Sequence, residues 1–297
     1  MLSESCQQQT LLLWKGRMKA TSQCTMKQLL LTSACVLLWS ACSDEGADTV
    51  RPHTDYQRIT LSEVITPADA QTVSWSQEFR FINGQIACST TSQSFGTGDE
   101  QFTITLSEAV TTTEGEVVVT DDEGTTTTYL LDDYGVATEA IRREAGGDTR
   151  AYRFSYISSG SHRRLHEMEE YLADTLFARL TFGELPTTTT DQWHLTQQVG
   201  QHSQTFVLTL VAPQQAADST SPVPPLFVSE LHPLTLHTTA LYGKLLGEVW
   251  LWVGGAASID GDAGQCAYSY TFTPEGQLAT CIQLTPQRRT VSYLFEW

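Results

Sequence analysis

The feature that most constrains this chain is a short run of alternating apolar and polar residues, which recurs from about residue 56 to residue 297. In the last run, Thr290 to Trp297, the residues Val291, Tyr293 and Phe295 alternate with mostly polar neighbours. Period-two alternation places the two kinds of side chain on opposite faces of a β-strand. We count about sixteen runs, and β-branched threonine, which favours strands, is abundant in them. The sequence therefore predicts an all-β fold.

Turns that contain glycine join many of these runs. Residues 79–86, 129–136 and 270–278 each have the form of an aromatic strand, a tight turn with glycine and a new alternating strand. Glycine supplies the positive φ that hairpin turns need. Chained hairpins give an antiparallel meander, so we expect a large curled sheet or an open or closed barrel.

Two stretches depart from this pattern. Residues 161–180 fit either an amphipathic helix or a hairpin that turns at Ala173-Asp174, and the surrounding repeat favours the hairpin. Residues 212–247 are rich in proline, and 234–246 within them fit a short helix or an ordered crossover. Because long structureless connections are uncommon in compact domains, we expect this Pro-rich crossover to pack on the sheet.

A segment of a different kind precedes the alternating region. Residues 26–41 begin with Met-Lys, continue as an apolar run and end in Ser-Ala just before Cys42, which is the pattern of a secretory signal. The run is much shorter than the roughly 20 apolar residues of a transmembrane helix. In a lipobox the cysteine becomes the new N-terminus and carries the acyl chains. We therefore expect lipidation at Cys42, with an ordinary cleaved signal as the alternative.

These observations divide the chain into three parts. Residues 1–41 hold an upstream extension followed by the lipoprotein signal, and residues 42–55 form a flexible acidic tether. Residues 56–297 form a single all-β domain. From Cys42 onward the chain keeps 13 of its 17 lysines and arginines and 33 of its 34 acidic residues, so its formal charge is about −20. Such a charge excludes a nucleic-acid partner, whose phosphates require a basic surface.

Strands in the second half of the chain are apolar on both faces, most clearly around Trp250 and Trp252. Coverage of the second face by the Pro-rich crossover is the favoured explanation. A groove that binds an apolar ligand or a partner, with Trp250 and Trp252 in its wall, is the alternative.

A search for reactive or metal-binding motifs finds little. His162 and His166 would share one face of a helix, as zinc sites require, but on a strand they lie about 13 Å apart, too far for one ion. Residues 260–264 resemble part of a calcium loop without its distal glutamate, so a turn is the better interpretation. Alternation places Cys266 on the inner face and Cys281 on the outer face of one hairpin, which excludes a disulfide between them unless a β-bulge intervenes. We expect no catalytic residue, no metal and no cofactor.

Several segments together resemble a known group. They are the Pro225 to Leu234 stretch, Leu241-Tyr-Gly-Lys, the strand and turn from Tyr268 to Gly276, and the terminal strand ending in Trp297. The chain from about 56 to 297 is similar to a lipoprotein domain of unknown function, with a described porin-like fold, from gut-type Gram-negative anaerobes. This resemblance implies a curled antiparallel sheet on a lipid anchor and brings no catalytic residues. The acidic residues after Cys42 also resemble a surface-export signal of such bacteria.

The sequence thus predicts a non-enzymatic lipoprotein of the outer membrane, held by its lipid and exposed at the cell surface if the export signal acts. We expect a binding or structural module whose partner is an unknown ligand or envelope protein. A carrier of a lipid or other apolar ligand in a half-open barrel is the alternative.

Overall fold

The computed structural model describes residues 54–65, 73–96, 101–159, 162–183, 192–210, 231–247, 257–261, 264–284 and 290–297. All of them belong to one compact unit, Thr49–Trp297. The lipidation site Cys42 and the speculative ligand-binding residues Trp250 and Trp252 lie outside the described residues.

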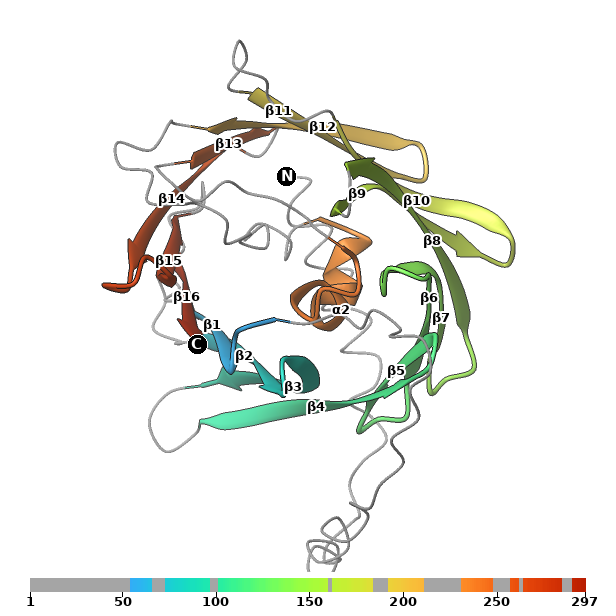
Figure 1. Cartoon of the computed structure of the whole chain (residues 1–297), viewed down its shortest axis with the longest axis horizontal. Coiled ribbons are helices and arrows are strands. Elements are labelled where there is room, and N and C mark those ends of the chain that lie inside the picture. Colours follow the sequence, from blue (N-terminus) through green and yellow to red (C-terminus); the bar gives the residue numbers. More distant parts are fainter. Residues whose placement is uncertain are drawn as a thin grey trace, which may run out of the picture. The chain divides into compact units, whose positions relative to one another are not determined.

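In these residues, sixteen strands follow one another around a closed barrel, each antiparallel to its neighbours (Figure 1). The first and last strands close the ring, with Leu61 opposite Tyr293. The strands are β1 (Arg58–Ile65), β2 (Val73–Ile82), β3 (Gln85–Phe95), β4 (Phe102–Thr113), β5 (Glu116–Asp121), β6 (Thr126–Leu131), β7 (Ala137–Arg143), β8 (Thr149–Ser159), β9 (His162–Leu172), β10 (Thr175–Phe182), β11 (Gln192–Val199), β12 (His202–Leu210), β13 (Ala257–Gly261), β14 (Gly264–Phe272), β15 (Leu278–Leu284) and β16 (Thr290–Glu296).

The predicted hairpins are confirmed. Asn83 and Gly84 join β2 to β3 with φ values of 52° and 74°, the left-handed pair that a two-residue hairpin turn requires. Residues 161–180 contain no helix in the part that is described: β9 and β10 pair along their length and turn at Ala173 and Asp174, whose φ values are 46° and 64°. The hairpin interpretation of this segment is therefore correct.

The barrel is apolar inside and polar outside. In β1, Ile59 and Leu61 point inward and are buried, whereas Arg58 and Thr60 point outward. The same alternation recurs around the ring, and the inward-facing set includes Phe79, Val117, Val119, Tyr129, Tyr152, Phe154, Leu165, Met168, Leu180, Leu195, Tyr268, Val291, Tyr293 and Phe295. The barrel interior is thus the hydrophobic core of the unit.

Ion pairs lie on the outer wall. Arg58 on β1 donates two hydrogen bonds to the carboxylate of Glu296 on β16, and its Nη1 lies 3.8 Å from Glu78 on β2. On the far side of the ring, Arg179 on β10 pairs with Glu169 on β9. Transmembrane barrels carry an apolar band on this surface and polar side chains in the lumen. The described wall has the opposite polarity.

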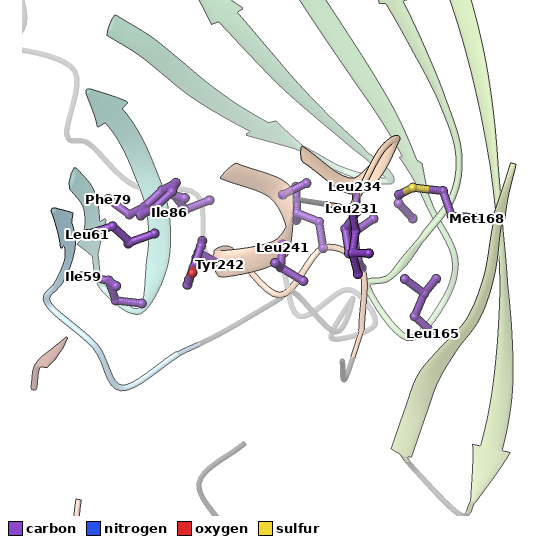
Figure 2. Packing of buried hydrophobic residues seen from close by; sticks show 14 of the residues in the cluster. Ile59, Leu61, Phe79, Ile86, Leu165, Met168, Leu231, Leu234, Leu241 and Tyr242 are labelled. Carbon is purple, nitrogen blue, oxygen red and sulfur yellow. The ribbon is translucent and has the colours of Figure 1, made fainter. Parts of the chain in front are cut away.

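A short plug fills the described part of the lumen. The 3-10 helix η3 (Leu234–His237) and the helix α2 (Thr238–Tyr242) lie inside the ring of strands (Figure 1). Leu231 and Leu234 face Leu165 and Met168 of β9, and Tyr242 lies near Phe79 of β2 (Figure 2). The described part of the Pro-rich crossover, residues 231–247, therefore packs on the inner side of the sheet. No helix in the described residues has the length and hydropathy to cross a membrane.

One predicted side-chain orientation is wrong. The register passes from Thr271 opposite Thr280 to Phe272 opposite Leu278, so Ala279 is an extra residue in β15. This β-bulge reverses the alternation. Cys281 consequently lies on the inner face and is fully buried, not on the outer face as its spacing from Leu278 predicted. It is opposite Tyr270, four residues along β14 from Cys266, and its thiol is free.

Candidate functional site

The contact between the plug, residues 231–247, and the inner wall is the most distinctive feature of the described chain. Leu231, Leu234, Leu241, Leu245 and Leu246 are all buried there. Polar groups of the plug also meet polar groups of the wall at several separate points. Because a buried polar group without a partner costs free energy, such pairings fix where a segment sits.

The strongest polar contact joins the start of the plug to β9. The side chain of Glu170 is fully buried and lies 2.7 Å from Nε2 of His232, while Arg150 on β8 donates a hydrogen bond of 2.5 Å to its other oxygen. Gln197 on β11 donates to the His232 carbonyl at 2.9 Å. Burial alone raises the pKa of Glu170, but the His232 and Arg150 interactions outweigh it and hold the pKa below its ordinary value. Glu170 therefore stays a carboxylate clamped between wall and plug.

His237 occupies an aromatic box at the end of η3. Nδ1 of His237 lies 2.7 Å from the hydroxyl of Tyr129, and its ring stands edge-on to Tyr152 and Phe154, with centroids 4.2 and 5.7 Å away. Burial, with a smaller contribution from the charge of Arg142, lowers the pKa of His237 to about 3. The imidazole is therefore neutral at physiological pH and acts as a packing and hydrogen-bonding group.

The helix α2 is held by a second polar cluster. Thr239 donates to Ser89 on β3 at 3.1 Å and also contacts Glu108 on β4, to which Ser89 donates at 2.6 Å. Gln77 on β2 donates to Thr238 at 3.2 Å. Helix and wall thus share a small network in which each described hydroxyl has a partner, which favours one docking position.

Two close backbone contacts hold the C-terminal end of the plug against the wall. The Leu245 carbonyl accepts a hydrogen bond of 2.7 Å from the Ala137 amide at the start of β7. Gly247 has φ of +65°, and a Cβ there would lie 2.5 Å from the carbonyl oxygen of Arg163. Glycine is needed here both for its backbone conformation and for its lack of a side chain.

These contacts, which we call the plug lock, hold residues 231–247 against the inner wall. Among the described residues they do not place a nucleophile beside a general base. The buried titratable groups that face the plug are a clamped carboxylate, a neutral imidazole and tyrosines whose pKa values burial raises. The gap that Ile86, Val117, Gly243 and their neighbours line inside the barrel measures about 10 Å³, about one water. Within the described ranges, no group of three His, Cys, Asp or Glu side chains converges as metal ligands do.

A second, polar hollow lies on the outer wall. It has a volume of about 320 Å³ and is formed by β7, β8 and β9, with Glu139, Arg153, Ser155, Glu167 and Glu169 among its lining residues. The guanidinium of Arg153 lies over the ring of Tyr171, 5.1 Å from its centroid. Charged and aromatic side chains beside an open groove suit a polar ligand better than an apolar one.

The residues predicted to form a site, Cys42, Trp250 and Trp252, lie outside the described residues. His166, considered above as a metal ligand, is hydrogen-bonded through Nδ1 to the Phe182 carbonyl at 2.8 Å. The sequence did carry one unused signal for the lock. Glu170 alternates with Met168 and Leu172 in β9, so an acidic residue was placed on an apolar face.

The prediction that follows from the His237 box concerns pH. Because its pKa is about 3 in the folded protein and about 6.5 in an unfolded chain, the unfolded state binds more protons as the pH falls below 6.5. Because of this group, we expect the free energy of unfolding to be about 3 kcal/mol lower at pH 4 than at pH 7. Urea unfolding at both values checks this.

His237→Phe removes the titration and keeps the aromatic packing, so its stability should fall less over this interval. His202→Gln, at an exposed position, is the matched control and should behave as the unmodified chain does. Equal pH dependence in all three proteins would contradict a buried neutral His237.

Comparison with known proteins places the fold. No protein-family model matches the chain, and no curated protein does. A solved structure described as a porin-like protein from Bacteroides uniformis is 29% identical, with a TM-score of 0.70 over 84% of this chain and 99% of that one. A second porin-like protein, from Bacteroides vulgatus, is 9% identical over 82% of this chain and 98% of that one, with a TM-score of 0.42. The likeness to the first confirms the porin-like part of the predicted resemblance: this chain has an all-β, barrel-like fold similar to that of a Bacteroides porin-like protein.

Proposed function

We propose that this protein is a non-enzymatic lipoprotein of the outer membrane, carried by acyl chains on Cys42, whose barrel stands in water as a binding or structural module. The polarity of the barrel supports this most directly. Its inward side chains are apolar and packed, and its outward side chains include the Arg58–Glu296 and Arg179–Glu169 pairs. Charged side chains on the lipid face of a barrel are destabilising at the bilayer midplane by about 2–4 kcal/mol each.

The plug argues against a role as an open pore. A pore requires a polar, water-filled lumen, whereas Leu241, Tyr242 and their neighbours fill the described lumen and pack against Phe79 and Ile86 (Figure 2). A binding role is instead supported on the outer wall, where the charged groove between β7 and β9 is open to solvent. Its ligand would be polar, such as a glycan or a segment of another envelope protein.

The experiment compares anchoring and conductance. The full chain, expressed in a Gram-negative host, should carry an acyl mass on Cys42 and sediment with membranes, whereas Cys42→Ser should lose both. Cys88→Ser, a matched cysteine in β3, should keep both. Reconstituted in planar bilayers, the acylated protein should give no stepwise conductance. Discrete channels would overturn the proposal, and so would turnover of a glycan or ester panel.

The carrier of an apolar ligand is retained as the second proposal. It was suggested by Trp250 and Trp252, which lie beyond the described part of the chain. Because β1 and β16 close the ring, an apolar ligand would have to enter at an end of the barrel and not through a gap in its wall. Native mass spectrometry of protein purified from cells decides between the two: a co-purified lipid supports the carrier, and a mass equal to that of the protein alone opposes it.

A further inference from the structure

Exposed apolar side chains gather at one end of the barrel. Nine large hydrophobic residues are exposed in the described chain. Five of them lie at the end where the even-numbered strands finish and the odd-numbered strands begin: Ile82, Leu130, Tyr134, Ile157 and Phe272, which are 37–64% exposed. We call this end, with its turns at 83–84, 132–136 and 273–277, the anchor rim.

The opposite end and the wall show no such set among the residues that are described. Phe102 and Leu284 are the exposed large hydrophobic residues near the opposite end, and Phe102 stacks on Phe95 with ring centroids 5.2 Å apart. Ile282 lies two residues from the opposite end of β15, and Leu294 lies two residues from the rim end of β16, as Ile157 does in β8; the strands beside them otherwise present polar groups. The accumulation at the anchor rim is therefore asymmetric along the barrel axis.

The tether joins the barrel at this same end. The Thr54 amide donates to the Gly84 carbonyl at 2.7 Å, and the ring of Tyr56 packs 4.3 Å from that of Trp297. Cys42 is twelve positions before Thr54. Even fully extended, this segment spans at most about 40 Å. A lipid on Cys42 would therefore be tethered to the barrel at the anchor rim.

We propose that the anchor rim rests on the surface of the bilayer, with Ile82, Leu130, Tyr134, Ile157 and Phe272 in shallow contact with the headgroup and upper acyl region. This inference depends on the proposed lipidation at Cys42 and adds a defined orientation to it. The contact is superficial, because the wall beyond the rim is polar. Tyr134 has a form suited to this depth: its ring lies 3.8 Å beneath the guanidinium of Arg163, and such amphipathic pairs favour the water–lipid boundary.

The charge of the anchor rim determines which lipid headgroups it contacts favourably. The turns at this end, that at 114–115 included, carry Glu114, Asp132, Asp133 and Glu275, against the cation of Arg163 beside Tyr134. Acidic turns are repelled by anionic headgroups, and the repulsion is screened by salt. The rim should thus prefer zwitterionic lipid, and its contact should weaken when anionic lipid is added at low ionic strength.

Hydrogen–deuterium exchange on vesicles tests the orientation. The full acylated chain is inserted into phosphatidylcholine vesicles and compared with the same chain in detergent. Amides at 82–85, 130–136 and 272–277 should exchange about tenfold more slowly on vesicles, whereas the opposite-end turns at 122–125, 144–148 and 200–201 should not change. Ile82→Ser with Phe272→Ser should abolish the protection, and Phe102→Ser with Leu284→Ser is the matched control at the other end.

The outcomes separate the two proposals. Absence of acyl mass on Cys42 contradicts the lipoprotein function, and the rim can then still be assayed as weak sedimentation of Cys42→Ser protein with the same vesicles. Acylated protein with unprotected rim amides, or with protection at the opposite end, overturns the rim proposal while leaving the anchor intact. Protection that appears in native outer-membrane vesicles and not in pure lipid would show that a protein covers the rim, and would also overturn it. Unchanged far-ultraviolet circular dichroism confirms that each variant is folded.

Discussion

Replacing Gly247 by alanine is expected to lower the free energy of unfolding by about 3 kcal/mol or more. The added Cβ would lie 2.5 Å from the Arg163 carbonyl oxygen and 3.1 Å from a ring carbon of Tyr156, and a non-glycine residue at φ of +65° adds its own strain. Neither neighbour can move freely, since Arg163 contributes backbone of β9 and the Tyr156 hydroxyl is hydrogen-bonded to the Ala137 carbonyl at 2.5 Å.

Gly200→Ala is the matched control for this substitution. Gly200 also has positive φ, +59°, but nothing lies within 4 Å of a Cβ built there. Gly200→Ala should lower the free energy of unfolding by about 1 kcal/mol, which is the cost of the left-handed backbone conformation alone. Urea unfolding followed by circular dichroism gives both values. If the two substitutions cost the same, the end of the plug does not pack against β9 as described.

The second large effect is expected at Glu170. Removing this carboxylate with Glu170→Ala leaves Arg150 in the lumen without the partner that it contacts at 2.5 Å and breaks the contact with His232 at 2.7 Å. Breaking a buried ion pair from one side costs about 3–5 kcal/mol. Arg150 keeps a second contact of 3.4 Å with Glu144, so the loss should lie toward the lower end of this range. We therefore expect a large loss of stability, together with faster hydrogen exchange in residues 231–237.

The neighbouring residue provides the control. Glu169 follows the opposite face of β9 and pairs with Arg179 on the outer wall. Glu169→Ala should cost about 1 kcal/mol, because its partner Arg179 is 38% exposed and can be solvated when the carboxylate is removed. Two adjacent glutamates of one strand would thus differ severalfold in their contribution. Equal losses would mean that the lumen is wet enough to solvate Arg150, which contradicts a dry plug lock.

Both expected losses arise because the plug residues are part of the hydrophobic core of the barrel. Figure 2 shows Leu241 and Tyr242 lying between opposite regions of the wall, and both residues belong to the same buried cluster as the wall side chains. A wide barrel in water needs such a filling, because an empty apolar lumen would forfeit burial and contacts. The fold thus resembles that of a Bacteroides porin-like protein, and the packed apolar surface of its described strands faces the lumen.

Several properties were accessible from the sequence because they are local. Period-two alternation identifies strands, and a glycine such as Gly84 identifies a hairpin turn, since both depend on residues within a few positions of one another. The resemblance to a porin-like fold was accessible for a related reason: the hairpin repeat and the segment around Leu241 to Lys244 keep recognisable patterns. Lipidation at Cys42 remains a prediction of the same local kind.

Other properties were decided by the tertiary structure alone. Closure of the barrel depends on the pairing of β1 with β16, which lie more than two hundred residues apart in the chain, and no local pattern encodes it. The β-bulge at Ala279 reverses the faces of β15, so alternation placed Cys281 outside although it is buried inside. The plug lock joins Glu170 to His232 across more than sixty residues. Local alternation determined that this chain forms hairpins, and long-range pairing and packing decided which side of them is the core.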